Sequence, residues 1–378
     1  MGKPLKLFFV VGEASGDLHA SNLIHALKKN KPDIEIEAWG GDLMEAQGAR
    51  IKKHYRELAF MGFIEVVKNL RTILRNLDIC EKQILEFKPD AVVLVDYPGF
   101  NIRIAKKLKK QGIKVIYYIS PQVWAWKQSR VHKLKEVVDE MYVILPFEPA
   151  FYQKFGMKVE FVGHPLLDAI QNFSATLQTR EEFCSEYGLD PSKKIVAILP
   201  GSRKQEIDVK LPVMMKMPMR FPEFQFVIAG APSVPDEWYH RSIFDEKTII
   251  IRNKTYQLLS HSHAAMVTSG TATLETALFG VPEVVCYKGS NISYQIAKRL
   301  VKVKYISLVN LIMDEMLVTE LIQHDFKEDK LQFELSRVLI DTDYRTRLML
   351  GYELLRQKLG GAGASQHTAS LLLKSMGY

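Results

Sequence analysis

The chain opens with an apolar run that ends in a glycine-containing turn, Leu5-Lys6-Leu7-Phe8-Phe9-Val10-Val11-Gly12-Glu13-Ala14-Ser15-Gly16-Asp17. The nearly continuous apolar character of residues 5–11 predicts a strand that is buried on both faces, as strands of parallel sheets are. Helical spacing of apolar residues follows over 18–29. A strand, a tight turn and a helix in this order predict the first unit of an α/β fold.

The same alternation continues to the end of the chain. Further strands are predicted at 34–39, 91–95, 115–119, 141–145, 195–199, 225–229, 248–251, 265–267 and 284–287, and helices at 102–110 and 366–375. This pattern predicts two doubly wound parallel sheets covered by helices, with ligand crevices at the carboxyl ends of the strands. We expect a linker within 163–192, domains over 1–168 and 169–345, C-terminal helices over 346–378, and a site between the two halves.

Composition narrows the class of protein. Lys and Arg number 51 against 43 Asp and Glu, which gives a net charge of +8. This excess favours anionic partners such as phosphate, nucleotides, nucleic acid or an acidic membrane surface. The three cysteines show no CxxC spacing, which argues against a zinc ribbon or a disulfide framework and fits a reducing compartment. Without an apolar stretch long enough to span a bilayer, we expect a cytoplasmic protein, attached at most to a membrane surface.

Two predicted strand ends in the first half carry residues that could bind a ligand or act as a general base. The turn after the first strand holds Gly12, Ser15 and Gly16, which would let a ligand approach the backbone and the helix N-terminus. The alternative is a tight turn in which Asp17 caps a helix. Asp96 follows the buried strand 91–95, where a general base could sit, although a carboxylate there also caps helices.

A third strand end carries two tryptophans. Trp124 and Trp126 lie within the segment 120–127, with Lys127 and Arg130 beside them. These residues predict a cleft wall that stacks on a sugar or packs on an acyl chain, or else two core tryptophans.

Two strand ends in the second half suit an anion. The turn Gly201-Ser202-Arg203 offers backbone N–H groups, a hydroxyl and a guanidinium to a phosphate, or is a turn with a solvated arginine. The helix start that follows residue 267 predicts a phosphate site with an acidic residue one turn further along for ribose hydroxyls, or simple helix capping. Its candidate residues are Ser269, Gly270, Thr271, Thr273 and Glu275. His261 and His263 lack a third ligand at a useful spacing, so we expect no metal there.

An unusually apolar segment lies at 59–70, with basic residues after it. Such a segment predicts either membrane-interface contact or a helix packed on the sheet. The residues expected to meet lipid are Phe60, Met61, Phe63, Ile64, Val66 and Val67.

Several motifs in this order resemble one family, the lipid-A-disaccharide synthases. They are the segments 12–17, 120–126, 145–148, 163–165, 199–203, 269–275 and 305–311. The resemblance runs from the first strand to at least Asn310, and more loosely through the last helix. It implies a GT-B glycosyltransferase, which has two Rossmann-like domains facing each other across a cleft, with the last helix packing back on the first domain.

The family resemblance also implies a reaction. A 2,3-diacylglucosamine unit passes from UDP to 2,3-diacylglucosamine 1-phosphate (lipid X), with inversion and release of UDP, in lipid A biosynthesis. By the motif match, Asp96 is the expected base, Arg203 lies near the diphosphate, Glu275 at the ribose and Asn310 at the nucleotide end. No metal or cofactor is implied. Peripheral contact with the inner membrane and homodimers that exchange C-terminal parts are expected.

Three other functions remain open from the sequence. A UDP-GlcNAc epimerase or another GlcNAc transferase would share the fold but carry different loop motifs. A non-catalytic nucleotide-sugar or lipid-binding protein would not need Asp96. A nucleic-acid binder would fit the charge, but no aromatic-basic RNA motif or helix-turn-helix signature accompanies it.

Overall fold

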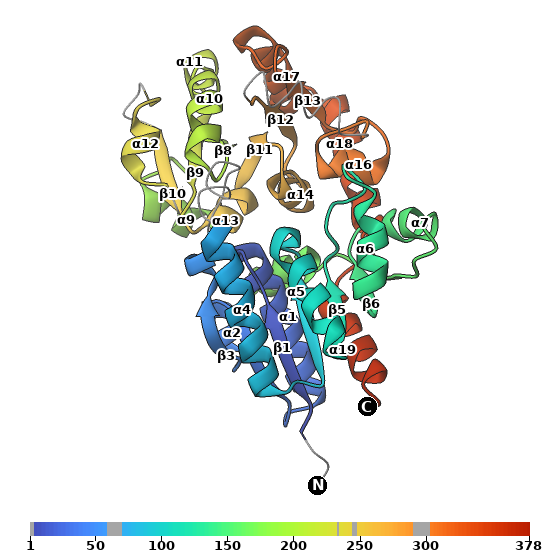
Figure 1. The fold of residues 1–378 in the computed structure, drawn as a ribbon. Coiled ribbons are helices and arrows are strands. Elements are labelled where there is room, and N and C mark those ends of the chain that lie inside the picture. Colours follow the sequence, from blue (N-terminus) through green and yellow to red (C-terminus); the bar gives the residue numbers. More distant parts are fainter. Residues whose placement is uncertain (1–3, 59–69, 233, 244–247, 290–302) are drawn as a thin grey trace. The chain divides into compact units, whose positions relative to one another are not determined.

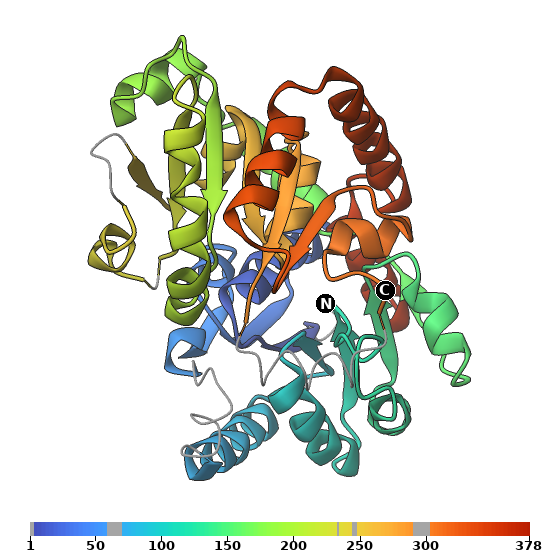
Figure 2. The ribbon, with the colours of Figure 1, turned by 90° about the horizontal axis from the view of Figure 1, so that it is seen from above.

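A computed structural model describes the chain except for residues 1–3, 59–69, 233, 244–247 and 290–302. Its internal contacts divide it into two units, the first formed by 1–169 with 359–378 and the second by 170–358. Each unit is built on a parallel sheet with helices packed against it, which confirms the predicted pair of α/β domains (Figures 1 and 2).

The sheet of the first unit has the strand order β3-β2-β1-β4-β5-β6-β7, and all neighbours run parallel. Its strands are β1 (Lys6–Val10), β2 (Glu35–Gly40), β3 (Arg50–His54), β4 (Ala91–Val95), β5 (Lys114–Tyr118), β6 (Glu140–Val143) and β7 (Glu160–Phe161). Its helices are α1 (Ala14–Asn30), α2 (Asp42–Ala46), the 3-10 turn η1 (Tyr55–Leu58), α4 (Leu70–Phe87), α5 (Pro98–Lys110), α6 (Arg130–Val137), α7 (Glu148–Gln153), α8 (Leu166–Ser174, across the boundary) and α19 (Ala364–Ser375).

Side chains that alternate along the strands bury both faces of this sheet. Phe8, Val92 and Tyr117 point to one face, where they pack with apolar residues of α4, α5 and α6. Their sequence neighbours point to the other face and are equally buried. Burial on both faces explains why the strands are continuously apolar.

The last helix belongs to the first unit, as the family resemblance implied. Helix α19 packs on α1. The carboxylate of Asp168 accepts hydrogen bonds from the backbone N–H groups of Gly363 (2.6 Å) and Ser365 (2.7 Å) at the start of α19. An anionic side chain at this end of a helix satisfies N–H groups that have no partner within the helix.

The sheet of the second unit has the order β10-β9-β8-β11-β12-β13, again all parallel. Its strands are β8 (Ile195–Leu199), β9 (Gln225–Gly230), β10 (Ile249–Arg252), β11 (Ser262–Thr268), β12 (Glu283–Tyr287) and β13 (Thr319–Ile322). Its helices are α9 (Arg180–Tyr187), α10 (Lys204–Met214), α11 (Met217–Arg220), α12 (Asp236–His240), α13 (Thr255–Ser260), α14 (Thr271–Leu278), α16 (Leu308–Met313), α17 (Glu328–Ile340) and α18 (Thr342–Lys358).

Both sheets reverse their winding at one point. In the first unit the reversal falls between β1 and β4, and in the second between β8 and β11. Ligands of doubly wound folds bind just outside the carboxyl ends of the strands at such a point. The four loops that follow these strands contain Ser15, Asp96, Arg203 and Ser269, so the topology brings the sequence candidates to the two expected positions.

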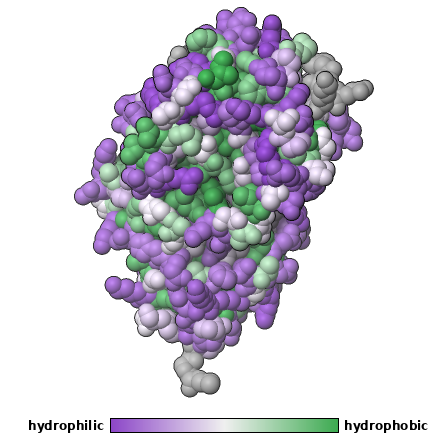
Figure 3. Space-filling model, turned by 180° about the vertical axis from the view of Figure 1, so that it is seen from behind, coloured by the Kyte–Doolittle hydropathy of each residue, from purple (hydrophilic) through white to green (hydrophobic). Residues whose placement is uncertain are grey.

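Hydrophilic side chains cover most of the face drawn in Figure 3, and apolar side chains lie among them in smaller groups. Within the described part of the chain, no helix is both long enough and apolar enough to cross a membrane.

Candidate functional site

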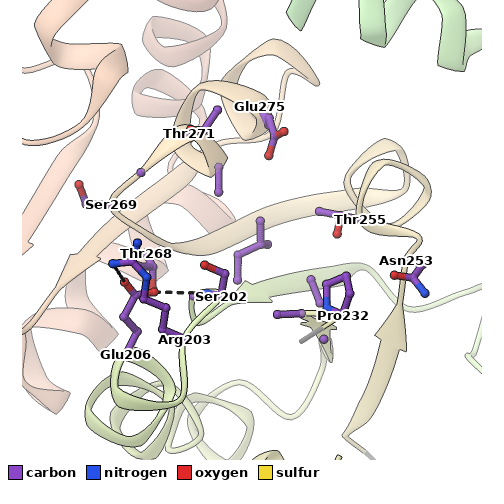
Figure 4. A pocket seen from close by; sticks show the side chains of 17 residues that line it. Ser202, Arg203, Glu206, Pro232, Asn253, Thr255, Thr268, Ser269, Thr271 and Glu275 are labelled. Carbon is purple, nitrogen blue, oxygen red and sulfur yellow. Dashed lines mark hydrogen bonds and ion pairs between the residues drawn. The ribbon is translucent and has the colours of Figure 1, made fainter. Parts of the chain in front are cut away.

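A cavity of about 540 Å³ opens at the carboxyl ends of β8 and β11 in the second unit (Figure 4). This volume lies within the usual range for small-molecule sites. Seven residues predicted from the sequence line it together: Gly201, Ser202, Arg203, Ser269, Gly270, Thr271 and Glu275.

The turn after β8 is shaped by Gly201 and Glu206. Gly201 has a φ of +121°, and a Cβ there would lie 2.4 Å from the Glu206 carboxylate. That carboxylate accepts a hydrogen bond from the Ser202 backbone N–H (3.2 Å) and pairs loosely with Arg203 (3.8 Å). The Arg203 side chain is 63% exposed. Because an exposed ion pair at this distance contributes little, an incoming anion can draw the guanidinium away from Glu206.

The opposite wall of the cavity is the start of α14. Ser269, Gly270 and Thr271 lead from β11 into this helix (Figure 4). The Ser269 hydroxyl donates to the carbonyl of Ile306 (2.9 Å), which ties the turn to the segment before α16. Helix α10 begins one residue after Arg203, so the N-terminal ends of two helices adjoin the cavity. Their positive ends favour an anionic ligand.

Glu275 lies one helical turn beyond Thr271. Its carboxylate accepts a hydrogen bond from the Tyr256 hydroxyl (3.2 Å), and burial raises its pKa. The remaining acceptor capacity of this carboxylate suits the hydroxyl groups of a sugar.

Besides Glu206, three further polar residues line the cavity without having been predicted, namely Asn253, Thr255 and Thr268. Asn253 follows β10 with a left-handed backbone (φ +57°). The sequence signal that could have located it is the polar pair directly after the predicted strand 248–251.

Arg252 does not line the cavity, but its side chain holds the neighbouring loop of the cavity wall in place. Its guanidinium donates to the carbonyls of Ala231 (2.9 Å) and Val234 (2.5 Å) and to the Asp236 carboxylate (2.8 Å). These bonds fix the loop after β9, whose residues Ala231 and Pro232 line the cavity.

We expect Arg252→Ala to loosen this wall and to raise the Kd for UDP by about 3- to 30-fold, because two partly buried carbonyls lose a charged donor. Titration calorimetry with UDP measures this change in Kd. Arg337→Ala is a matched control, since Arg337 pairs with Glu334 within α17. An unchanged Kd in Arg252→Ala would show that the loop holds its shape without the guanidinium.

Two predicted residues lie outside this lining. The Thr273 hydroxyl donates to the Gly270 carbonyl (2.9 Å) and is buried inside α14. The Asn310 amide donates to Val318 and Glu320 and accepts from the backbone N–H groups of Leu317 and Val318, all at 2.8–2.9 Å. Both side chains therefore support the fold in this structure, and their direct contact with a nucleotide stays a prediction.

Asp96 stands at the reversal point of the first sheet, directly after β4. The Tyr117 hydroxyl (2.5 Å) and the Asn101 amide (2.8 Å) both donate to its backbone carbonyl, and its N–H donates to Tyr118 (3.1 Å). Asp96 and Tyr97 have φ values of 44° and 47°, a left-handed conformation that is uncommon outside glycine. The backbone is thus held in a strained form at the place where the carboxylate leaves the sheet.

Burial is the main cause that raises the pKa of Asp96 to about 7, and the negative charge of Glu13 adds to it. A carboxyl group with a pKa near the working pH is suited to accept a proton, because both of its protonation states are accessible. This combination of place and pKa supports the role of a base.

The glycines after β1 serve packing. A Cβ at Gly12 would lie 2.3 Å from the ring of Tyr97, and one at Gly16 would lie 2.8 Å from Val11. Ser15 is exposed in the first turn of α1 and is accessible to a ligand. The Asp17 carboxylate accepts from backbone N–H groups at the start of α2, so it caps that helix.

The two tryptophans have different environments. Trp124 is buried and packs edge-on against Phe147 at 5.0 Å, whereas Trp126 is exposed. The Ser120 hydroxyl, at the start of their segment, donates to the buried Glu148 carboxylate. The residues from Phe60 to Val67 that were expected to meet lipid lie outside the described part of the chain. Among the described residues, no group of three or more His, Cys, Asp or Glu side chains is arranged to hold a metal ion.

The chain is similar to known proteins over nearly its whole length. The family model for LpxB, lipid-A-disaccharide synthetase, matches residues 7–373. A lipid-A-disaccharide synthase of Trichlorobacter lovleyi is 38% identical (99% of this chain, 98% of the relative), and one of Syntrophus aciditrophicus is 40% identical (97% of each).

Solved structures with a similar fold include a UDP-GlcNAc 2-epimerase of Neisseria meningitidis bound to UDP-GlcNAc. It has a TM-score of 0.70 and 14% identity, with 98% of this chain and 100% of that chain covered. The glycotransferase of kitacinnamycin has a TM-score of 0.64 and 13% identity, with 99% of each chain covered. At such low identity these likenesses bear on the fold alone, and they confirm the expected GT-B class.

Proposed function

The chain belongs to the lipid-A-disaccharide synthase family and is a glycosyltransferase of lipid A biosynthesis, and from this premise we propose how it works. It transfers 2,3-diacylglucosamine from UDP to the 6-hydroxyl of 2,3-diacylglucosamine 1-phosphate. The products are the β-1′,6-linked disaccharide 1-phosphate and UDP. Family membership supports both substrates.

Asp96 is the base of this reaction. The acceptor hydroxyl attacks the anomeric carbon from the side opposite UDP, the new C–O bond forms as the bond to the diphosphate breaks, and Asp96 takes the hydroxyl proton. This displacement inverts the anomeric carbon. The observation that carries the assignment is a partly buried carboxylate with a pKa of about 7 at the reversal point of the first sheet.

The cavity of the second unit receives UDP. The Arg203 guanidinium and the N-terminal ends of α10 and α14 stabilise the charge that develops on the leaving diphosphate. Glu275 accepts hydrogen bonds from the ribose. What supports this arrangement is the convergence of these groups on one cavity (Figure 4).

The experiment incubates the purified protein with UDP-2,3-diacylglucosamine and lipid X in detergent and follows UDP and disaccharide by mass spectrometry. Disaccharide that requires both substrates would support the proposal. A parallel incubation with UDP-GlcNAc tests the epimerase alternative. Epimerised sugar nucleotide, or UDP-sugar binding without any disaccharide, would overturn the proposed reaction.

Because both substrates carry acyl chains, we also propose that the protein works at the cytoplasmic face of the inner membrane. The homodimer with exchanged C-terminal parts that the resemblance implied stays a prediction, which light scattering of the purified protein tests.

The apolar segment 59–70 is the proposed contact with lipid. We expect the double substitution Phe63→Ser and Ile64→Ser to lower vesicle binding by about 3- to 30-fold, since each residue loses its favourable transfer into the interface. Co-sedimentation with vesicles measures binding, and the Kd for UDP should stay constant. Leu177→Ser, at an exposed leucine of the second unit, is the matched control. Equal vesicle binding by the double variant and wild type would refute the assignment.

A further inference from the structure

The segment between β5 and α6 presents an exposed tryptophan with two cations. The Trp126 side chain is 40% exposed. Lys127 Nζ lies 4.7 Å and Arg130 Cζ lies 5.2 Å from the centre of its ring. Both distances are within the range of cation–π attraction, so both positive charges are held at the same indole ring.

In the part of the chain that the structure describes, these two charges have no acidic counterpart within ion-pair distance. Among the described residues, no carboxylate lies within 4.0 Å of Lys127 or Arg130. Two like charges at one side chain repel each other, and an anion that contacts them would relieve that repulsion. The electrostatics of this turn therefore favour an anionic ligand.

The backbone holds this arrangement in place. Lys127 has a left-handed backbone (φ +52°), and its carbonyl accepts the N–H of Arg130 (2.9 Å), which closes a turn that brings both side chains to the ring. The Gln128 amide donates to the carbonyl of Trp124 (3.3 Å), whose own side chain is buried. A site with its backbone fixed in this way loses less entropy when it binds a ligand.

The position in the fold relates these cations to the proposed base. Their segment follows β5, and β5 pairs with β4, the strand that ends at Asp96. The Tyr117 hydroxyl of β5 donates to the backbone carbonyl of Asp96 (2.5 Å). The positive charge of Arg130 acts on Tyr117, whose pKa it lowers against the larger effect of burial. The cations and the base therefore belong to the same edge of the first sheet.

We propose that Lys127 and Arg130, held by Trp126, bind the 1-phosphate of the acceptor sugar. This assignment rests on the proposed function. A phosphate monoester carries up to two negative charges and presents oxygen pairs that match the fork of a guanidinium, while a lysine adds a point charge. The phosphate of the acceptor is a different anion from the diphosphate of UDP, which the cavity of the second unit receives. Binding it at the edge that carries Asp96 orients the acceptor for proton removal.

The first experiment compares wild type with the double variant Lys127→Ala and Arg130→Ala. We expect the KM for lipid X to rise by about 10- to 100-fold, with little change in kcat or in the KM for the donor, because charge-assisted hydrogen bonds to one substrate are lost. Lys133→Ala, an exposed lysine one turn into α6, is the matched control. Trp126→Ala should raise the same KM less, since both cations remain.

A second arm removes the anion from the substrate. For wild type, replacing lipid X by 2,3-diacylglucosamine without the phosphate should lower kcat/KM. The factor should be about the same as the one by which the double variant falls below wild type with lipid X. The double variant should show little further loss with this acceptor, because the interaction is already absent. Independent losses that multiply would overturn the proposal, as would an unchanged KM for lipid X.

A third arm separates an acceptor site from attraction to lipid headgroups. In detergent, calorimetric binding of lipid X should weaken in the double variant, while co-sedimentation with anionic vesicles should change little. Weaker vesicle binding with an unchanged affinity for lipid X would overturn the proposal in favour of a membrane contact. If wild type bound lipid X but formed no disaccharide, the proposed function would fail, and the calorimetric comparison would still decide whether these cations hold the phosphate.

Discussion

Asp96→Asn is expected to lower kcat by about 10²- to 10⁴-fold, which is the contribution usual for a general base. Asparagine keeps the size and shape of the side chain, and it tolerates the left-handed backbone that Asp96 adopts (φ 44°). The loss should therefore come from the missing proton acceptor and not from a changed fold. Initial rates of UDP release with both substrates saturating measure it.

The dependence of kcat/KM on pH in the wild type tests the role of Asp96 independently. Burial raises the pKa of Asp96 to about 7, so the carboxyl group is protonated below that pH and is ionised above it. A base must be ionised to accept a proton, so kcat/KM should rise as the pH increases through about 7 and then level off. Asp96→Asn should remove this rise.

The thermal stability of Asp96→Asn is the control that separates lost catalysis from a damaged fold. An Asp whose pKa is raised in the folded state binds more protons folded than unfolded between pH 4 and 7, so its contribution to stability falls as the pH rises through that window. The neutral asparagine avoids this loss, and the thermal midpoint at pH 8 should stay equal or increase. A lower midpoint would attribute the lost activity to damage of the fold. A rate within threefold of wild type would exclude Asp96 as the base.

The central strands of both sheets could be predicted because they are buried on both faces. Predicted residues 91–95 and 195–199 coincide with β4 and β8. The strands β3 and β13 were not predicted, and both lie at sheet edges. In β3, Arg50-Ile51-Lys52-Lys53-His54, most side chains are charged or polar, so the apolar signal that marks an inner strand is absent.

The part of the candidate site that lies at the ends of the central strands could be predicted from the sequence. Arg203 lies in the loop after β8, Ser269 directly follows β11, and parallel topology gathers such positions. The strand before Asn253 was predicted, but Asn253 itself was missed because β10 lies at the sheet edge, away from the reversal point where a site is expected. The partners of a polar side chain are also hidden in a sequence. Asn310 resembles a ligand residue by its motif, but four internal hydrogen bonds occupy its amide.

The two tryptophans also show that the surroundings of a side chain cannot be read from the sequence. Spacing alone gave one prediction for both residues, either a cleft wall or the core. In the structure each alternative applies to one of them, with Trp124 in the core and Trp126 exposed. Residues two apart point in opposite directions when the backbone between them turns, and nothing in their spacing reveals that turn.

Arg203→Ala is expected to weaken UDP binding by about 10- to 100-fold and to lower kcat/KM for the donor by about 10²- to 10³-fold. Among the described residues that line the cavity, Arg203 is the cationic side chain, whereas Glu206 and Glu275 are acidic. Without the guanidinium, the charged side chains among these lining residues would all be acidic. The effect on the rate should exceed the effect on binding, because charge on the leaving group increases in the transition state.

Calorimetry with UDP and steady-state rates measure the two effects separately. Arg203→Lys should restore part of the binding, since it returns the charge without the fork of donors. Arg220→Ala is the control, because Arg220 pairs with Glu328 on the surface of the same unit. Unchanged affinity for UDP in Arg203→Ala would mean that the helix ends of α10 and α14 hold the diphosphate by themselves. A loss equal to that of Arg220→Ala would point to a general effect of charge on the second unit instead of a contact within the cavity.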